Sequence, residues 1–388
     1  MLLSVQKHDA DRLKRRDRLD RAKRFEEPDR VPVCFGIGGS YYCWLQGVNI
    51  RDYYADPEMQ VAVQLGGIEW EYEYLRADSS VADSIGYDGG PVGEAIVFGA
   101  EVQRPDGTSP RIVHCCESLD DVLKLRVPGP EGNPRLKEYI AQAERHAATA
   151  RKMGVKLQVE VPRTVGIHPP LSALCALMDP TSVYAAMYTE PEKLRAALDL
   201  MFEGFVTYRE HGAEPGALRN AGFGLADDNI SQISTEMFRQ WEMPYYQRFR
   251  ERYSPTHFYL HTDGPNDQHF RTLADEVKLN AMDIGGFSSL SEAVKHMKGK
   301  VHIHGGLQCQ DFYAPDGMTE ETRIKALKAM RLAGPGGGFE LAIGGECYVG
   351  VSPRGIRELV EMVEEYGRYP LRIESDQEPR CAAGNHDG

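Results

Sequence analysis

The feature that most constrains the fold of this chain is a repeated alternation of short apolar segments with amphipathic segments of helical period. The apolar segments predict strands at residues 30–39, 155–162, 220–228, 256–261, 279–285, 300–305 and 338–344. Strands that alternate with helices require parallel pairing and right-handed crossovers. We therefore expect an α/β fold of the (β/α)8 TIM barrel type, with a doubly wound open sheet as the structural alternative.

The length of 388 residues fits one large barrel, because such barrels run past about 250 residues when their loops carry insertions. We expect an N-terminal helical extension over residues 1–29, the barrel over 30–369 and a tail without periodicity over 370–388. A pattern of strand, Pro-Asp-Gly turn and strand predicts a β-hairpin inserted near 90–116. The extension holds a charged helix at 10–27, which we interpret as a solvated cap or a subunit contact.

Local sequence patterns predict where several helices begin. Thr189 and Glu192 form the pattern of a capping box, which predicts that a helix opens there. Thr319 is expected to cap another helix, and Pro353 lies in the first turn of the last one. A further helix is predicted over 134–152. The glycines after the first strand predict a loop that permits close approach of a ligand.

Charge and hydropathy exclude several classes of protein. The chain has 58 acidic and 45 basic residues, a formal charge of −13 that repels a nucleic-acid backbone. No apolar run reaches the roughly 18 residues of a membrane span, and the charged N-terminus does not resemble a signal peptide. The eight cysteines include no CxxC pair, so a disulfide scaffold is not indicated. We expect a cytoplasmic protein.

In a parallel barrel the active site lies at the carboxyl ends of the strands. Polar residues follow four of the predicted strands: Asp227, Asp228 and Asn229; His261 and Asp263; His302 and His304; Glu346 and Cys347. We expect these side chains to meet at the barrel mouth. His302 and His304 alternate and should share one face, where a structural role is favoured slightly over a catalytic one.

His261-Thr262-Asp263 is an HxD pattern, whose outer side chains point the same way on extended backbone and can reach one ion. Cys347, distant in sequence but expected at the same mouth, offers a third ligand. Nitrogen, oxygen and sulfur ligands with one open position are typical of catalytic zinc. The alternative is that His261 and Asp263 only cap a turn.

Other candidates have weaker support. Asp227 and Asp228 are either helix caps or groups that orient a polar substrate or a ligand residue. His168 is expected on a mouth loop. Tyr41, Tyr42 and Trp44 follow the first strand and either wall an apolar substrate pocket or pack in the interior.

The stretch from Arg30 to Tyr369 resembles uroporphyrinogen decarboxylase-like proteins, in particular the branch of cobalamin-dependent methyltransferases. The resemblance is carried by RVPV (30–33), YYADPEMQ (53–60), LADDNISQISTEMFRQWEMPYYQRF (225–249), HFYLHTDG (257–264) and the segment from GPGGGFELAIG to VEMVEEYG (334–367). It implies a TIM barrel that acts on small molecules. It also makes a homodimer reasonable.

The resemblance also separates the branches of the family. The decarboxylases have an arginine after the first strand and a histidine after the last one, whereas this chain reads FGIGGSYYCW and GECYVGVSP there. The methyltransferase branch has a zinc site written HxC with a distant Cys. His261 matches its histidine, Asp263 replaces the first cysteine, and Cys347 or Glu346 falls near the second.

The resulting expectation is a zinc-dependent demethylase. It would move a methyl group from a small methylated substrate, such as a methoxylated aromatic, to a cobalamin (corrinoid) carried by a partner protein. His261, Asp227 and Asp228 are the expected catalytic residues, with Asn229, His168, His304 and the three aromatics near the substrate. Alternatives are a metal-free decarboxylase or lyase, a methylcobamide to thiol methyltransferase, and a barrel that only binds a ligand or scaffolds a corrinoid protein.

Overall fold

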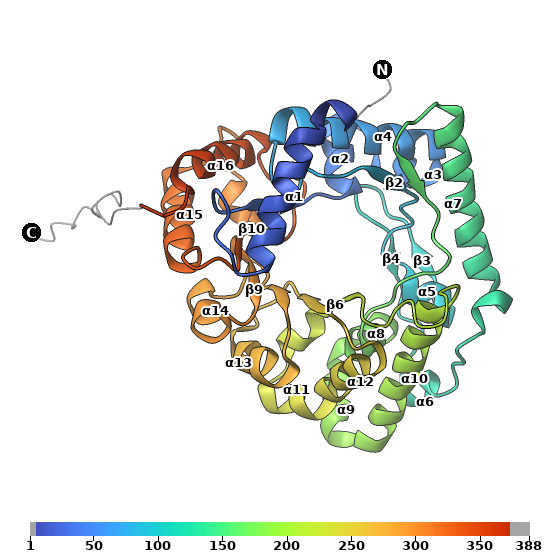
Figure 1. Cartoon of the computed structure of the whole chain (residues 1–388). Coiled ribbons are helices and arrows are strands. Elements are labelled where there is room, and N and C mark those ends of the chain that lie inside the picture. Colours follow the sequence, from blue (N-terminus) through green and yellow to red (C-terminus); the bar gives the residue numbers. More distant parts are fainter. Residues whose placement is uncertain (1–4, 373–388) are drawn as a thin grey trace, which may run out of the picture.

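A computed structural model describes residues 5–372 of the chain. Its parallel strands curve around a common axis, with helices on the outside (Figure 1). The eight strands of this ring are β1 (Val33–Gly36), β2 (Ser84–Gly86), β5 (Gln158–Glu160), β6 (Gly222–Ala226), β7 (His257–His261), β8 (Ala281–Asp283), β9 (His302–Leu307) and β10 (Phe339–Glu346). The predicted (β/α)8 barrel is confirmed.

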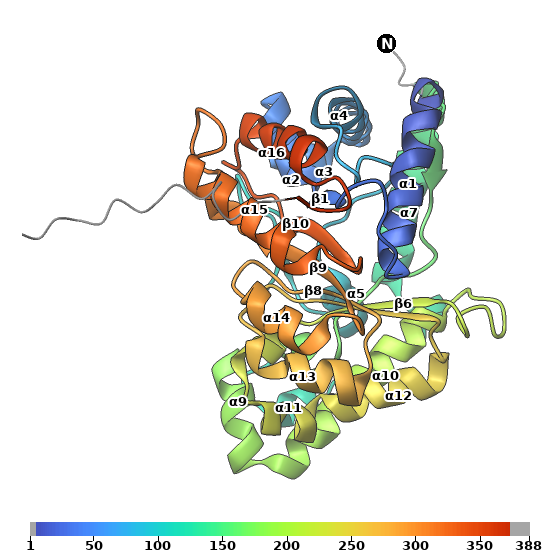
Figure 2. The ribbon, with the colours of Figure 1, turned by 60° about the vertical axis from the view of Figure 1, so that its left-hand side comes forward.

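The helices are α1 (Asp9–Lys23), α2 (Gly39–Gln46), α3 (Ile50–Ala55), α4 (Pro57–Trp70), α5 (Gly93–Phe98), α6 (Leu119–Val122), α7 (Pro134–Lys152), α8 (Pro170–Leu177), α9 (Pro180–Thr189), α10 (Pro191–Glu210), α11 (Thr235–Trp241), α12 (Met243–Tyr253), α13 (Phe270–Thr272), α14 (Leu290–Met297), α15 (Glu320–Ala333) and α16 (Pro353–Tyr366). Figure 2 shows α9 and α11 to α14 covering the outside of β6 to β8. Among the described residues, no helix has the length and apolar character to cross a membrane.

The eight strands of the ring form two sheets. Six pair in parallel in the order β1-β10-β9-β8-β7-β6, and β2 pairs in parallel with β5. The register aligns His261 of β7 with Asp283 of β8, and Asp283 with His304 of β9. These three side chains therefore lie beside one another near the same edge of the larger sheet.

The outer face of β6 rests on aromatic side chains. Phe223 packs against Phe249 of α12 with ring centroids 5.4 Å apart, and Phe249 packs against Phe205 of α10 at 4.5 Å. All three rings are buried. Buried aromatic surface of this kind makes a large contribution to core stability, so these contacts fix β6 and the residues that follow it.

The interior of the barrel contains a large cavity. A cavity of about 880 Å³ extends from α1 at the amino ends of the strands to Glu346 at the carboxyl end of β10. Barrels of this class usually fill their interior with side chains. Here Gly36, Gly224 and Gly345 lie on the cavity wall and leave it open.

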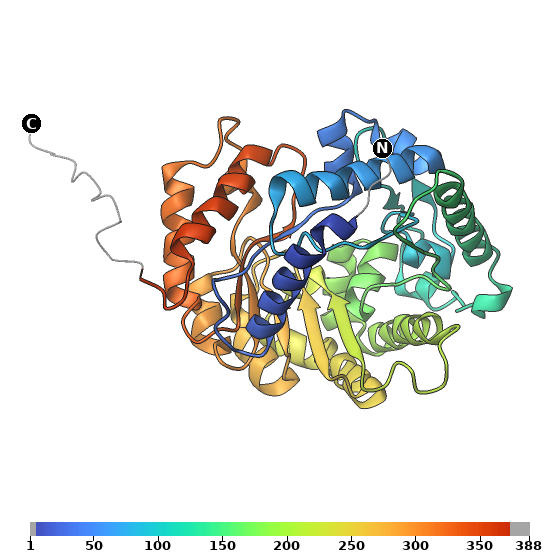
Figure 3. The same ribbon diagram turned by 45° about the horizontal axis from the view of Figure 1, so that its top comes forward.

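The charged helix α1 differs from its prediction as a solvated element. It crosses one end of the ring (Figure 3), and Arg15 and Arg18 are buried. Its C-terminal end is fixed to the start of β10, because the Gly338 N–H donates to the carbonyl of Ala22 at 3.1 Å. The charge pattern predicted a solvated helix, but ion pairs with Asp29 and Asp78 compensate the burial of Arg18, and Arg15 donates to the Ser80 carbonyl.

Three local predictions fail. Residues 93–98, expected as the first strand of the hairpin, form α5, and the hairpin is reduced to β3 (Val102–Gln103) and β4 (Arg111–Ile112). Thr189 ends α9 and does not cap the next helix, since its hydroxyl donates to the Ala185 carbonyl, although the predicted helix does follow as α10 from Pro191. The expected loop after β1 is helix α2. In each case the local pattern suits both states, and tertiary packing decides.

Other helix boundaries agree with the sequence. Helix α7 spans Pro134–Lys152, and the side chain of Thr319 accepts from the Thr322 N–H to cap α15. Pro353 opens α16, whose buried face carries Ile356, Leu359, Val360 and Val363. Of the predicted tail, residues 373–388 lie outside the described part of the chain.

Candidate active site at the barrel mouth

Three predicted site residues converge where β6 and β7 end. Potential ligand atoms of Asp228, His261 and Asp263 all lie within 4.8 Å of one another, so this group could hold a metal ion. Nε2 of His261 lies 3.5 Å from Oδ1 of Asp263. Thr262 between them is fully buried, which turns its two neighbours toward the mouth, as the HxD alternation predicts.

The loops that carry these ligands are tied together. The backbone N–H of Asp263 donates to Oδ1 of Asp228 at 2.8 Å, and the Tyr348 hydroxyl lies 3.4 Å from Oδ2 of Asp263. Gly345 packs closely against the same group, since a Cβ there would lie 2.5 Å from Oδ1 of Asp263. The space around Asp263 is therefore restricted on two sides.

Asp283, at the end of β8, contacts the ring nitrogen Nδ1 of His261 and so orients the imidazole. Its Oδ2 lies 3.0 Å from His261 Nδ1 and also accepts the Gly345 N–H at 3.2 Å, while its Oδ1 accepts the Gly285 N–H at 3.0 Å. A carboxylate on one ring nitrogen orients the other toward a metal. Sequence reasoning missed Asp283, although an acidic residue ending the apolar segment LNAMDIG was a usable signal.

The same contact controls the charge of both groups. Burial opposes both ionised forms, but the hydrogen bond together with the attraction of neighbouring charges outweighs it: the pKa of His261 is raised to about 9, and the pKa of Asp283 is lowered. Without a metal, His261 is thus an imidazolium at neutral pH. A metal must displace this proton to bind Nε2.

Glu346 and Cys347 lie apart from the ligand group. Among the described residues, the group that converges contains neither of them. The Cys347 N–H donates to the Gly36 carbonyl, and its buried thiol has a pKa raised by burial. Glu346 lines the cavity, and burial raises its pKa although His261 opposes this.

Asp227 lies beneath the site. It is fully buried, accepts from the Ser172 hydroxyl at 2.5 Å and from the Tyr246 hydroxyl at 2.7 Å, and has a pKa raised to about 6 by burial. The Ser172 hydroxyl in turn accepts the Asn229 N–H at 3.2 Å. These bonds fix the turn η4 (Asp228–Gln232), which presents Asp228 to the mouth.

His168 and His304 occupy other parts of the interior. The N–H of His168 donates to Oε1 of the buried Glu94, and its Nδ1 lies 2.8 Å from the same oxygen. His304 lines the cavity with Nδ1 3.1 Å from Oε2 of Glu340. His302 shares that face, as predicted, with Nε2 3.4 Å from Oε1 of Glu340.

The predicted aromatic wall is not part of the cavity lining. Tyr41 is fully buried and donates to the Val351 carbonyl at 2.8 Å, and Tyr42 is buried against Glu71. Trp44 is half-exposed on α2. The apolar part of the cavity wall instead includes Val165, Ile167, Phe205 and Leu225, which the sequence pattern could not assign because it does not show how β5 and β6 separate.

The family match and one solved structure agree on the fold. Residues 14–366 match the model of the uroporphyrinogen decarboxylase (URO-D) family. A methyltransferase from Methanosarcina mazei has 18% identity and a TM-score of 0.63, over 91% of this chain and 98% of that chain. A putative vitamin-B12 independent methionine synthase from Listeria monocytogenes has 11% identity and a TM-score of 0.42, over 87% and 96%. No curated protein matches.

Proposed function

The chain belongs to the uroporphyrinogen decarboxylase family, and from that premise we propose that it is a zinc-dependent methyltransferase. It removes a methyl group from a small methylated substrate in the barrel and delivers it to a cobalt(I) corrinoid on a partner protein. The observation that carries this proposal is the convergence of Asp228, His261 and Asp263 at the mouth. The structural similarity to a methyltransferase is consistent with it.

The residues present fit a zinc ion. Histidine nitrogen and carboxylate oxygen are ordinary zinc ligands, and three protein ligands with an open position are typical of catalytic sites. Asp228 takes the place that we predicted for Cys347, so the ligand set has no sulfur and is harder. Zinc bound there would act as a Lewis acid toward the oxygen of a methyl ether or ester.

The chain's own groups then have defined roles. Asp283 keeps the proton of His261 on Nδ1 and leaves Nε2 free as a ligand. Asp227 acts through Ser172 to position Asp228. Glu346 lines the cavity and has a pKa raised by burial, and we assign to it the transfer of a proton to the oxygen that loses the methyl group.

The size and lining of the cavity favour a substrate with an apolar or aromatic body. Its volume of about 880 Å³ lies within the range of small-molecule sites, about 300–1,000 Å³. Val165, Ile167 and Phe205 give one side an apolar wall, whereas His261 and Glu346 lie at the mouth. A methoxylated ring would bury its body below and keep its methyl group near the opening.

Exposed apolar side chains around the mouth favour the docking of a partner protein there. Large apolar residues that follow the carboxyl ends of strands remain exposed: Trp44, Val161, Phe287, Tyr313, Tyr348 and Val349. Exposed apolar surface that gathers in one region marks interaction sites. A corrinoid protein that docks on these loops would bring its cobalt to the open end of the cavity.

One observation favours a second candidate, a decarboxylase or lyase that acts on a carboxylated substrate. Arg209 lines the cavity, its guanidinium lies over the rings of Phe223 and Tyr253, and its buried Nε has no hydrogen-bond partner among the described residues. It could bind a substrate carboxylate. Asp227 is less suitable as a group that stabilises charge in such a reaction, because both of its carboxylate oxygens already accept hydrogen bonds.

Methyl transfer to free cobalt(I) cobalamin tests the proposal. We expect the native protein with zinc to form methylcobalamin from at least one methoxylated aromatic donor, and His261→Ala to form none. Carbon dioxide release from a carboxylated analogue, lost in Arg209→Gln but retained in His261→Ala, would support the second candidate instead.

A further inference from the structure

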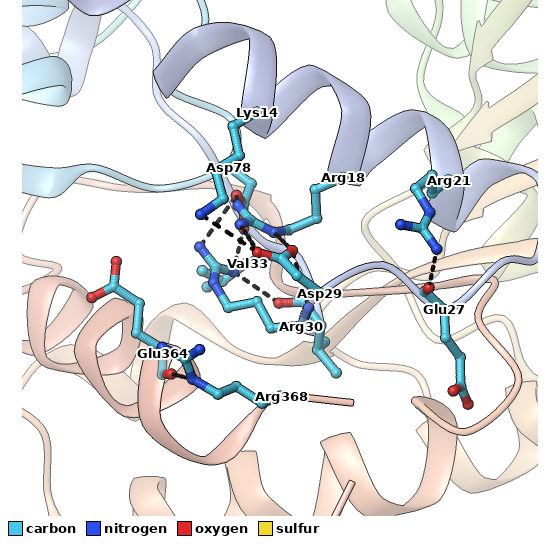
Figure 4. Close-up of polar contacts among 11 residues, drawn as sticks. Lys14, Arg18, Arg21, Glu27, Asp29, Arg30, Val33, Asp78, Glu364 and Arg368 are labelled. Carbon is cyan, nitrogen blue, oxygen red and sulfur yellow. Dashed lines mark hydrogen bonds and ion pairs between the residues drawn. The ribbon is translucent and has the colours of Figure 1, made fainter. Parts of the chain in front are cut away.

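A second cavity, of about 210 Å³, lies at the opposite end of the barrel from the metal candidates. Its walls come from α1, the segment before β1, the residue that follows the turn η2 (Glu71–Leu75) and the end of α16. Figure 4 shows the side chains of α1, of the segment before β1 and of the end of α16 that face one another. The lining residues are Asp11, Lys14, Arg15, Arg18, Asp29, Arg30, Arg76, Glu364 and Arg368. We call it the arginine cavity.

The arginine cavity carries an excess of positive charge. Six of its lining residues are cations and three are carboxylates. Asp78, buried behind the wall, adds a fourth carboxylate, which leaves two positive charges in excess. This excess stands out on a chain with a net charge of −13.

The carboxylates of Asp78 and Asp29 both have their oxygens occupied by hydrogen bonds and ion pairs within the protein. Asp78 accepts from Arg30 Nη1 at 2.6 Å and from the Val33 N–H at 2.8 Å, and it also pairs with Arg18. Asp29 accepts from Arg18 Nε at 2.6 Å and Nη2 at 2.7 Å. These pairs anchor α1 to the barrel, as Figure 4 shows, and they leave no oxygen of Asp29 or Asp78 for the other cations except in a long contact between Lys14 and Asp29.

The remaining arginines form no ion pair with a carboxylate of the described residues, although Asp11 and Asp78 attract Arg15 at longer range. Arg15 is buried, yet its guanidinium donates only to the Ser80 carbonyl. Arg368 donates through Nε to the carbonyl of Glu364. None of the described residues forms a hydrogen bond or ion pair with the guanidinium of Arg76. Three guanidinium groups with free donors thus line one small space.

The geometry points to a binding site for a phosphate group in the arginine cavity. Guanidinium groups present forked donors that match the oxygens of a phosphate, and a phosphate dianion would balance the two excess charges. The cavity is smaller than the roughly 300 Å³ of the smallest drug-sized sites, so it suits a compact anion. Inorganic phosphate and the phosphate of a small organic ester share this chemistry.

Arg76 offers a variant that keeps the fold. Its φ of +59° lies in the left-handed region, where glycine is favoured, so Arg76→Gly removes the guanidinium and relieves the backbone. Lys278 provides the matched control. It is an exposed cation with φ +60° that also follows a π-helical turn, η6 (Leu273–Val277), and it is not part of the arginine cavity.

Calorimetric titration with inorganic phosphate, at constant ionic strength set with chloride, tests the inference on the full chain. We expect saturable binding by the native protein and by Lys278→Gly, and about tenfold weaker binding by Arg76→Gly, the loss of one charge-assisted contact. The thermal midpoint should rise with phosphate in the native protein and the control.

The source of the phosphate is decided by a second titration with adenosine monophosphate. Tighter binding than inorganic phosphate would assign the cavity to an organic ester, and equal or weaker binding would assign it to the free ion. Absence of saturable phosphate binding, or equal affinity of native protein and Arg76→Gly, would overturn the inference.

Discussion

Nδ1 of His261 lies 3.0 Å from Oδ2 of Asp283, across two adjacent strands whose register places these residues side by side. This contact determines which nitrogen of the imidazole faces the mouth. It joins the one histidine of the candidate metal site to the carboxylate that is most firmly held by backbone N–H groups there. The metal affinity of the site should therefore depend on a residue that does not touch the metal.

Asp283→Asn should lower zinc affinity about 10- to 100-fold without removing any ligand, because the amide cannot hold the histidine tautomer as the carboxylate does. Competition with a chromogenic chelator measures this. Asp199→Asn, a surface change on α10, is the matched control. An unchanged zinc affinity in Asp283→Asn would mean that His261 is not a ligand or is oriented by another group.

Gly345→Ala should weaken metal binding while the protein stays folded. The added methyl group would lie 2.5 Å from Oδ1 of Asp263 and would displace this ligand. The positive φ of +77° costs a further 1–2 kcal/mol, roughly, for any non-glycine residue.

Gly99→Ala separates these two effects. Gly99 has φ +87° and no atom within 4 Å of its added methyl group, so it carries the backbone cost alone. Zinc titration should show weaker binding in Gly345→Ala and native affinity in Gly99→Ala. Equal affinity in both variants would show that Asp263 is not a ligand or tolerates displacement.

His302 should make the protein sensitive to mild acid. Burial lowers its pKa from 6.5 to about 4, so the unfolded chain binds the proton more readily than the folded one. Stability contributed by the neutral ring is complete above pH 6.5 and is lost as the pH falls toward 4, by roughly 3 kcal/mol. His302→Asn should remove this part of the pH dependence.

Urea unfolding at several pH values measures the effect as the difference between native protein and variant. His296→Asn on α14 serves as the control, since His296 is partly exposed and pairs with Glu292. If the native protein and His302→Asn lost stability in parallel between pH 6.5 and 4, the buried neutral histidine would not be the cause.

The sequence predicted the elements that depend on strong periodicity or on a local cap. The alternation of strands and helices, α7, and the caps at Thr319 and Pro353 all agree with the structure. Thr189 and α5 were wrong because their local patterns suit more than one state, and the choice depends on packing with distant segments. The tail beyond residue 372 is not described.

The site was predictable only in part for a similar reason. His261 and Asp263 could be paired because two residues on one strand share a face. Asp228 joins them through the contact of its side chain with the Asp263 N–H, which no sequence spacing reports. Cys347 follows β10 as expected, but the turn after that strand points its thiol to the interior beside Cys309 rather than to the ligand group.

The most direct test of the central claim is the metal content of the purified protein and of two variants. We predict one zinc per chain in the native protein and in Cys347→Ala, and none in His261→Ala, because the proposed site consists of Asp228, His261 and Asp263 without the thiol. A native protein without metal, or zinc that is lost in Cys347→Ala and kept in His261→Ala, would contradict the account.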